Sequence, residues 1–578
     1  MPKMKASDYI ATFLRVQQTS HVFEVAGGMI THMLDSIYQL GNMNIISVHH
    51  EQSAAFAADA YGRHTKRPGV ALATSGPGAT NLLTGVGSCY FDSSPALFIT
   101  GQVNTYECKK DRPIRQLGFQ ETDIVSMAKP ITKKSYQVQS PDQLETAMQE
   151  LYTLAISDRP GPVLIDIPMD IQRAIIDVED VQYLHPSKTQ APLVLDDSLD
   201  HIFEALKKAK KPLILAGQGV SCSNATEKFL QLVDLLQIPV VTSLLGLDLL
   251  PFKHPLRIGM IGSYGNRWAN MALGTCDLLI VIGSRLDIRQ TGADAEGFAR
   301  NKTIFHIDCD TGEINNRIKN CIPIVSDAEY FIREALSYFQ NKNAGDKKEW
   351  LAEIRSLQIQ WPDTKELKDF SGINPNQFVH ALSSNTPQYA AFVADVGNHQ
   401  MWAAQSLELY RGQSFITTGG MGAMGFALPA AIGYSLAAQK KPVVVIAGDG
   451  AFQMNIQELQ TIIRNRLPIK IVIINNNALG MIRQFQDSYF NGRYQSTYWG
   501  YSAPDFAAIA KAYGLATHTI SEPDEIDAGV AWLHEDPASP ALLQVMVSPH
   551  MNVYPKIAFG KPITEMEPFA KPSEMECT

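Results

Sequence analysis

An aspartate and an asparagine in the C-terminal third of the chain follow two apolar runs and have the chemistry of metal ligands. Residues 448–450 (GDG) follow the run VVVIA, and residues 475–477 (NNN) follow the run IKIVII. The spacing of Asp449 and Asn476 accommodates a strand–helix–strand crossover, which would place both at the carboxyl ends of neighbouring parallel strands. Carboxylate and carbonyl oxygens are the ligands that Mg²⁺ prefers, together with phosphate oxygens. The pattern therefore predicts a site for Mg²⁺ and a diphosphate, with an ordinary tight turn as the alternative for GDG alone.

Similar apolar runs recur along the whole chain and indicate the elements that must position this pair. Each run is followed by a Gly-rich or polar turn, which is typical of strands buried on both faces of a parallel sheet. Helix-length segments such as 196–210 and 424–439 separate the runs. The alternation predicts an α/β fold with doubly wound parallel sheets. The runs lie at 69–78, 97–103, 162–168, 212–219, 278–285, 303–310, 442–450 and 469–476.

Two polar stretches divide the chain into predicted domains. Residues 174–195 are rich in charges and prolines, and residues 340–375 are rich in lysine and glutamate. The Pro- and Glu-rich stretch 550–578 is expected to form a tail or an arm over another surface. The predicted domains are 1–185, 186–360 and 361–578, each large enough for a core of its own.

The composition excludes several classes of protein. The chain has 578 residues, a mass of 63.7 kDa and a formal net charge of −9, with 45% hydrophobic and 19% charged residues. There is enough apolar mass to form cores, which argues against disorder. The acidic balance and the lack of a Lys/Arg run argue against nucleic-acid binding.

The cysteines and the apolar stretches favour a cytoplasmic protein. The seven cysteines form no C-x-x-C pair, which argues against a disulfide framework or a zinc site and fits a reducing compartment. The first residues lack the apolar core of a signal peptide, and no run of about 18 apolar residues predicts a membrane span.

The GDG and NN pair resembles the binding signature of thiamin-diphosphate-dependent enzymes. The resemblance extends over nearly the whole chain and is closest to the acetolactate synthase group. The matching stretches are HEQSAAFAADAYGR (50–63), TSGPGATNLLTG (74–85), ITGQV (99–103), GFQETDIV (118–125), RPGPVLIDIP (159–168), VGNHQMWAAQ (396–405), GGMGAMGFALPAAIG (419–433) and GDGAFQMNIQEL (448–459).

The resemblance implies that Glu51 is the catalytic glutamate. In this family a glutamate hydrogen-bonded to the pyrimidine N1′ drives the removal of a proton from C2 of the thiazolium. Without the resemblance, Glu51 would be interpreted as a solvated carboxylate that complements the dipole at the start of a helix. A carboxylate that shares a proton with N1′ should be partly buried.

The resemblance also assigns the residues that hold thiamin diphosphate and Mg²⁺. Met424 would force the bent cofactor conformation, although it could simply fill a core. Residues 420–425 also match G-x-G-x-x-G, but the acidic partner that a nicotinamide site needs, Asp449, already belongs to GDG. The implied metal ligands are Asp449, Asn476 and the carbonyl of Ala478, and the implied cofactor-binding residues are Gly28, Pro77, Asn81, Val396, Gly397, Asn398, His399, Gly422, Met424, Asp449, Gly450, Ala451, Asn476, Leu479, Gly480 and Met481.

Two further groups of residues follow from the same resemblance. Gln102, Phe119 and Gln120 match residues that line the reaction pocket, and Gln102 could donate to a developing alkoxide or be an internal structural residue. In the acetolactate synthases the central stretches hold FAD, which has no redox part in the main reaction, although many relatives have lost it. The candidate FAD residues are Gly217, Gly219, Gly283, Ser284, Arg285, Asp308 and Asp327.

Three departures from the acetolactate synthase pattern lie on the acceptor side. Arg289 matches the arginine that meets the carboxylate of the second keto acid, but Ile288 replaces the usual aspartate before it. Met169 replaces a lysine, and Phe485 replaces a tryptophan. The acceptor pocket is therefore expected to be less polar, which leaves open a ketone acceptor such as a nucleotide-linked keto-deoxysugar. Arg112 and Arg115 could face its phosphates.

The expected activity is decarboxylation of pyruvate and addition of the acetyl unit to a second carbonyl compound. A homodimer or homotetramer is expected, with the first and third domains pairing across subunits. One alternative is a simple 2-keto-acid decarboxylase, but the pair His49-His50 directly precedes Glu51, which is the wrong place for it. A non-catalytic subunit is the other alternative, and it would be expected to lack Glu51, Asp449 or Asn476.

Overall fold

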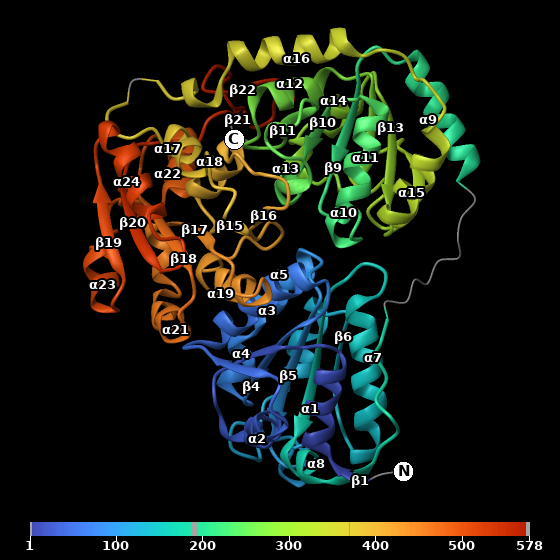
Figure 1. Ribbon diagram of the computed structural model, residues 1–578, viewed down its shortest axis with the longest axis vertical. Coiled ribbons are helices and arrows are strands. Elements are labelled where there is room, and N and C mark those ends of the chain that lie inside the picture. Colours follow the sequence, from blue (N-terminus) through green and yellow to red (C-terminus); the bar gives the residue numbers. More distant parts are fainter. Residues whose placement is uncertain (1–2, 186–194, 369, 574–578) are drawn as a thin grey trace.

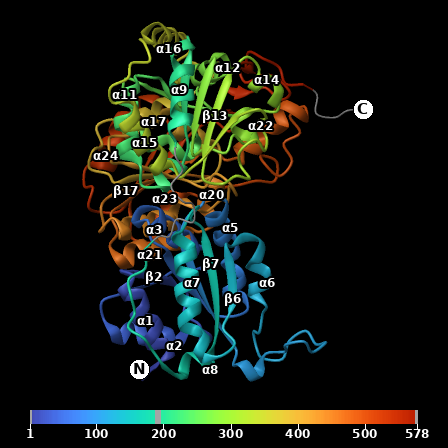
Figure 2. The same ribbon diagram turned by 90° about the vertical axis from the view of Figure 1, so that its right-hand side faces the viewer.

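Three parallel β-sheets of six strands each form the framework of the computed structural model, which describes residues 3–185, 195–368 and 370–573 (Figure 1). The N-terminal sheet lies below the other two in both Figure 1 and Figure 2, and Figure 1 shows the central and C-terminal sheets side by side above it. The prediction of an α/β fold with three parallel sheets is confirmed. The sheets fall in three different predicted domains, whose exact boundaries stay a prediction.

The N-terminal sheet has the strand order β3-β2-β4-β5-β7-β6. Its central strands are buried along their whole length, because helices pack on both faces and form two separate apolar clusters. The strands are β2 (His21–Glu24), β3 (Asn44–Ser47), β4 (Gly69–Ala73), β5 (Ala96–Gln102), β6 (Lys134–Gln137) and β7 (Pro162–Pro168), and a separate antiparallel pair joins β1 (Lys3–Lys5) to β8 (Ile175–Asp177). The helices are α1 (Ala6–Val16), α2 (Thr31–Leu40), α3 (Glu51–Thr65), α4 (Pro77–Asn81), α5 (Leu83–Phe91), α6 (Ile124–Ala128), α7 (Leu144–Ile156) and α8 (Met169–Arg173).

The central sheet has the order β11-β10-β9-β12-β13-β14. Its second apolar cluster includes Ile557, Ile563 and Met566, so the C-terminal stretch returns as an arm over the central domain. Residues 574–578 of that stretch, with Cys577, lie outside the described residues, as do residues 186–194 of the predicted joint 174–195. The strands are β9 (Pro212–Ala216), β10 (Val240–Thr242), β11 (Arg257–Met260), β12 (Leu278–Ile282), β13 (Thr303–Asp308) and β14 (Ile322–Val325). The helices are α9 (Asp196–Lys208), α10 (Gly219–Cys222), α11 (Thr226–Leu236), α12 (Arg267–Thr275), α13 (Ile288–Thr291), α14 (Ala295–Ala299), α15 (Ala328–Phe339) and α16 (Lys348–Gln360).

The C-terminal sheet has the order β16-β15-β17-β18-β20-β19, so β17 and β18 are neighbours near its centre. The strands are β15 (Ala391–Ala394), β16 (Ser414–Ile416), β17 (Val443–Gly448), β18 (Ile469–Asn475), β19 (Ala516–Ile520) and β20 (Ala541–Met546), with an antiparallel pair of β21 (Lys556–Ile557) and β22 (Met566–Glu567) in the arm. The helices are α17 (Pro375–Ser383), α18 (Asn398–Ser406), α19 (Ala427–Ala437), α20 (Asp449–Gln453), α21 (Leu459–Asn465), α22 (Gly480–Tyr489), α23 (Phe506–Ala512) and α24 (Ile526–His534).

Helices α3 and α19 join the N-terminal and C-terminal domains through small residues. A Cβ atom at Gly433 would lie 2.0 Å from the carbonyl oxygen of Ala57, so only glycine allows this approach. The rings of Phe56 and Phe426 pack edge to face at 5.3 Å beside it. The alanine-rich sequence of α3 therefore serves domain contact as well as helix propensity.

A buried ion cluster lies at the same interface. Arg63 of α3 donates to Asp59 at 2.6 Å, to Asp92 at 3.0 Å and to the carbonyl of Thr417 at 2.8 Å. Asp92 in turn accepts the backbone N–H groups of residues 419 and 420 at 3.1 and 2.7 Å. The cluster thus fixes the start of the segment that carries Met424 to the N-terminal domain.

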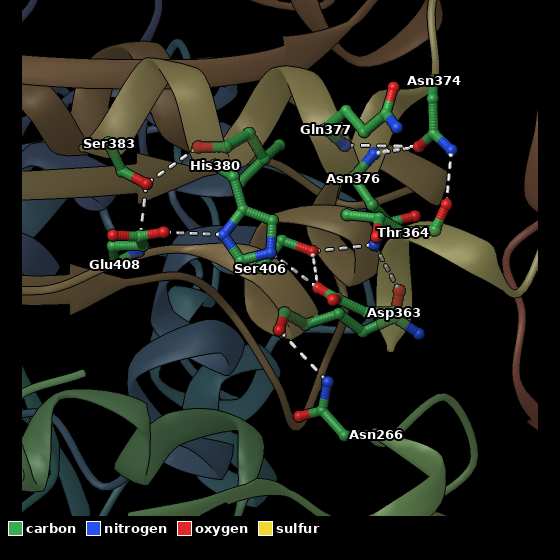
Figure 3. A network of polar contacts seen from close by, with 12 residues as sticks. Asn266, Asp363, Thr364, Asn374, Asn376, Gln377, His380, Ser383, Ser406 and Glu408 are labelled. Carbon is green, nitrogen blue, oxygen red and sulfur yellow. Dashed lines mark hydrogen bonds and ion pairs between the residues drawn. The ribbon is translucent and has the colours of Figure 1, made fainter. Parts of the chain in front are cut away.

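A histidine network ties the segment between α16 and α17 to the C-terminal domain (Figure 3). The two ring nitrogens of His380 lie 2.9 Å from Glu408 and 2.9 Å from Asp363. Burial lowers the pKa of His380, but hydrogen bonds and attraction from these carboxylates outweigh it, so the pKa is raised. Only the imidazolium form can donate to both neighbours.

We expect the stability supplied by this network to fall as the pH rises. Because the folded-state pKa of His380 is raised above the usual value of 6.5, its contribution is complete below that value and is lost as the pH passes the folded-state pKa. His380→Gln should cost about 1.5–3 kcal/mol at low pH and less at high pH. Thermal unfolding midpoints of both proteins on either side of neutrality test this. A gap of equal size at both pH values would contradict it.

Candidate active site

Asp449 lies where buried strand β17 ends and helix α20 begins, at the carboxyl edge of the C-terminal sheet. Its carboxylate is buried and accepts a hydrogen bond from the hydroxyl of Tyr501 at 3.1 Å. Burial raises the pKa of Asp449 to about 6, against the lowering effect of Tyr501 and nearby backbone N–H groups. No ion-pair partner reaches Asp449 within the described residues. A buried carboxylate without a cationic partner is suited to bind a metal ion.

Asn476 directly follows the neighbouring strand β18, as the spacing predicted. The backbone N–H of Ala478 donates to its side-chain oxygen at 3.3 Å. A Cβ atom at Gly480 would lie 2.5 Å from the amide nitrogen of Asn476 and 2.6 Å from that of Asn398. The glycine therefore lets the two asparagines meet. No cluster of three His, Cys, Asp or Glu side chains suited to a metal exists in the described part of the chain, so a metal here would rely on amide and backbone oxygens.

Residues 396–399, which we call the diphosphate segment because they are predicted to bind the diphosphate, lie at the N-terminus of α18. The His399 ring lies against two glycines, since a Cβ atom at Gly397 or at Gly448 would come within 2.7 and 2.6 Å of it. Burial lowers the pKa of His399 to about 3, so the imidazole is neutral. The side-chain oxygen of Asn398 and Nε2 of His399 are buried without a hydrogen-bond partner in the described residues. Such unpartnered polar atoms need an explanation. As an N–H group, Nε2 of His399 could donate to a diphosphate oxygen, whereas the Asn398 oxygen is an acceptor and would need a donor or a cation.

Glu51 is the first residue of α3 and is partly buried, as its predicted role requires. Its carboxylate accepts a hydrogen bond from the amide of Asn81 at 2.9 Å. The turn that precedes Pro77 and α4 has Gly76 at φ +69°, and a Cβ atom there would lie 3.0 Å from Gln120. The structure thus brings together Glu51, Asn81, Pro77 and Gln120 from separate parts of the sequence.

Asn455 connects the N-terminal and C-terminal domains next to Glu51, and this link was not identified from the sequence. Its amide nitrogen donates to the side chain of Gln52 at 3.1 Å and to the carbonyl of Gly425 at 2.8 Å. Its oxygen accepts from the hydroxyl of Ser53 at 3.0 Å. The residues after Glu51 are therefore hydrogen-bonded to the segment that carries Met424. A polar residue soon after GDG was the only signal.

Comparisons with known proteins cover nearly the whole chain. Residues 4–127, 199–335 and 395–545 match the N-terminal TPP binding domain, the central domain and the C-terminal TPP binding domain of thiamine pyrophosphate enzymes. The acetolactate synthase large subunit of Lactococcus lactis is 37% identical over 546 residues, which are 94% of this chain and 93% of that protein.

The chain belongs to the acetolactate-synthase-like family of thiamin-diphosphate-dependent enzymes.

Two further relatives support the same assignment. The large subunit of acetolactate synthase isozyme 2 of Escherichia coli is 36% identical over 578 residues (97% of this chain, 99% of that protein). The probable acetolactate synthase large subunit of Methanocaldococcus jannaschii is 38% identical over 538 residues (90% and 88%). The resemblance drawn from the sequence motifs is confirmed at the level of the family.

Met424 and Leu479 cover the glycine that follows Asp449. A Cβ atom at Gly450 would lie 2.5 Å from Leu479 and 3.5 Å from the methyl group of Met424. Because Gly450 has no side chain, its backbone stays accessible beside these two apolar side chains. Ala451 and Gly480 are buried nearby on α20 and α22, and Met481 on α22 packs toward the C-terminal core.

Three predicted residues are less closely tied to this arrangement. Gln102 is buried, donates to Thr122 and Asp166, and accepts from its neighbour's N–H, which favours the structural interpretation. Phe119 is 79% exposed. Gly28 is exposed and begins the 3-10 turn that follows β2. Their roles at a reaction pocket stay predictions.

A cavity of about 700 Å³ lies where the three domains meet. Candidate FAD residues of the central domain form part of its wall, and close backbone contact explains its glycines, since a Cβ atom at Gly217 would lie 2.2 Å from the carbonyl oxygen of Gly283. Val396 and Gly422 also line it, so the cavity reaches the diphosphate segment. The FAD candidates in its wall are Gly219, Gly283, Ser284, Arg285, Asp308 and Asp327.

The residues that depart from the acetolactate synthase pattern are spread over several elements. Arg289 lines the cavity and is exposed, beside Ile288, which is 56% exposed. Phe485 lies on α22 and contacts the ring of Tyr489 at 4.6 Å. Met169 starts α8. These residues therefore lie on three helices, α8, α13 and α22, which belong to three different predicted domains.

The remaining predictions about the chain concern thiols and membranes. The described cysteines, Cys89, Cys108, Cys222, Cys276, Cys309 and Cys321, are free thiols. Within the described ranges, helices that could cross a membrane are absent.

Proposed function

We propose that this protein is a thiamin-diphosphate-dependent carboligase that decarboxylates pyruvate and adds the two-carbon unit to a second carbonyl compound. The observation that carries the proposal is the placement of Asp449 and Asn476 at the ends of the neighbouring strands β17 and β18, beside the buried ring of His399. When bound, thiamin diphosphate supplies the electron sink for the decarboxylation.

Each half of the site has a distinct task in this proposal. The oxygens of Asp449, Asn476 and Ala478 would hold Mg²⁺, which clamps the diphosphate. The buried Nε2 of His399, which lacks a partner in the described residues, could donate to a diphosphate oxygen as an N–H group. Glu51 would hold a proton at the pyrimidine N1′, and Asn81 would orient its carboxylate.

We also propose that the central cavity takes a dinucleotide such as FAD. Its size suits a dinucleotide. Its glycine-lined strand ends suit the diphosphate, and its acidic residues Asp308 and Asp327 suit the hydroxyls of a ribose. Asp327 is also the N-cap of α15, where its side chain accepts the backbone N–H groups of Glu329 and Tyr330.

A ketone acceptor, such as a nucleotide-linked keto-deoxysugar, is the second candidate function. It is favoured by the apolar Ile288 beside Arg289 at the cavity and by the exposed Arg112 and Arg115. A simple decarboxylase is less well supported, because His50 accepts the N–H of Gln52 as the cap of α3.

Assembly and location complete the proposal. We propose domains 1–185, 186–360 and 361–578 and a homodimer or homotetramer, in line with the family's pairing of first and third domains. A cytoplasmic location is supported by the free thiols.

Product analysis tests the proposal. The purified protein is supplied with pyruvate, thiamin diphosphate and Mg²⁺, with and without a small ketone, and its visible spectrum is recorded for flavin. Rapid formation of acetolactate from pyruvate alone supports pyruvate as acceptor. Slow homocoupling with a tertiary alcohol from the ketone supports the second candidate. Release of acetaldehyde alone would contradict carboligation.

A further inference from the structure

The segment between α22 and α23 bridges the two parts of the predicted metal site. We call residues 494–501 the aromatic strap, because four of its eight residues are aromatic: Tyr494, Tyr498, Trp499 and Tyr501. The strap is anchored at three places. One anchor touches the residue that follows a predicted metal ligand, and another touches the predicted ligand Asp449 itself.

The first anchor lies on the side of Asn476. The backbone N–H of Leu479 donates to the carbonyl of Thr497 at 2.9 Å. Thr497 is 3% exposed, and its hydroxyl donates to the carbonyl of Tyr494 at 3.2 Å. The strap is therefore hydrogen-bonded to the residue that directly follows Ala478, a predicted metal ligand.

The second anchor lies on Asp449 itself. The hydroxyl of Tyr501 donates to Oδ2 of Asp449 at 3.1 Å. A Cβ atom at Gly450 would lie 3.3 Å from the same hydroxyl, so Gly450 leaves room for the phenol. The phenol therefore orients the carboxylate, and an ionised carboxylate has further lone pairs that can face a cation.

The third anchor makes the base of the strap rigid. The hydroxyl of Tyr494 donates to Asp487 on α22. Asp487 also pairs with the buried guanidinium of Arg483 at 2.8 Å, which lies 5.6 Å from the centre of the Tyr494 ring. The strap is thus fixed to α22 at one end and to Asp449 at the other.

We propose that Tyr501 is a positioning residue that orients Asp449 toward Mg²⁺, and that the strap holds the Asp449 and Asn476 segments in register. This inference rests on the proposed function. Hydrogen-bond partners of metal ligands fix ligand geometry, and their loss typically costs about 10–100-fold in metal affinity. Tyr501 is 52 positions away from Asp449 in the sequence and belongs to no motif.

The test is a Mg²⁺ titration of Tyr501→Phe after removal of metal and cofactor with a chelator. Thiamin diphosphate is kept constant, and bound cofactor is measured by ultrafiltration and by tryptophan fluorescence. We expect the Mg²⁺ concentration at half-saturation to rise about 10-fold or more, with kcat at saturating Mg²⁺ nearly unchanged. Tyr498→Phe is the matched control, because the Tyr498 ring packs against His550 instead of the site.

The outcomes separate the two proposals. If the wild-type protein shows no Mg²⁺-dependent cofactor binding, the proposed function fails and the inference fails with it. If the wild-type protein binds and Tyr501→Phe has the same half-saturation, only the inference is wrong. Equal shifts in Tyr501→Phe and Tyr498→Phe would also overturn it, because they would indicate a general effect on strap packing.

Discussion

Replacing Glu51 by glutamine is expected to reduce turnover by about 10²–10⁴-fold, the usual contribution of a positioned acid–base group. Glutamine fills the same space and can still pair with Asn81, but it cannot hold and return a proton at N1′. Thiamin diphosphate should remain bound, because Glu51 takes no part in holding Mg²⁺ or the diphosphate. Steady-state rates with pyruvate, together with the amount of bound cofactor, check both parts.

A matched control separates this role from the helix-dipole interpretation of Glu51. Glu349 is an exposed carboxylate in the first turn of α16. Glu349→Gln removes a similar interaction with a helix dipole, which is worth about 0.3–1 kcal/mol, and should leave turnover unchanged. Full activity in Glu51→Gln would contradict the catalytic assignment.

Asp449→Asn should weaken the binding of Mg²⁺ and thiamin diphosphate by at least about 100-fold, since loss of an outer partner alone costs up to that much. Asparagine preserves the shape of the side chain but removes the only carboxylate in the proposed ligand set. Isothermal titration with Mg²⁺ and the cofactor measures the effect. The fold should survive, because the buried carboxylate has no ion-pair partner among the described residues and its neutral replacement is easier to bury.

The control for this variant is an aspartate near the amino ends of the strands of the same sheet, whereas Asp449 lies at their carboxyl ends. Asp536 is exposed and precedes β20, so Asp536→Asn should leave the affinity unaltered. Unchanged affinity in Asp449→Asn would mean that the metal site lies elsewhere.

The fold and the placement of Asp449 and Asn476 at one edge of the sheet could be predicted, because both depend on local sequence. Asp449 and Asn476 follow runs of β-branched residues directly, so parallel pairing of β17 and β18 is enough to bring them to one edge. Glu51 was found through its motif, and its partial burial agrees with the expected role.

The links between the parts could not be predicted, because they depend on domain packing. Asn455 contacts Gln52 from 403 positions away, and no periodicity carries that information. The same holds for Arg63, because its acidic partner Asp92 accepts a hydrogen bond from the backbone that precedes Met424. For Gln102, residue type alone could not decide between a pocket and an internal network, since an amide suits both.

The walls of the central cavity come from all three domains, and this has a consequence for how the chain unfolds. Arg159, Asp308 and Gly420 line it from the N-terminal, central and C-terminal parts respectively. A ligand that requires all three walls binds only the docked arrangement. By mass action, at 100 times its dissociation constant it adds about 2.7 kcal/mol to that state. Such a ligand would strengthen the contacts between the three domains without taking part in the chemistry, and would make the domains unfold more cooperatively.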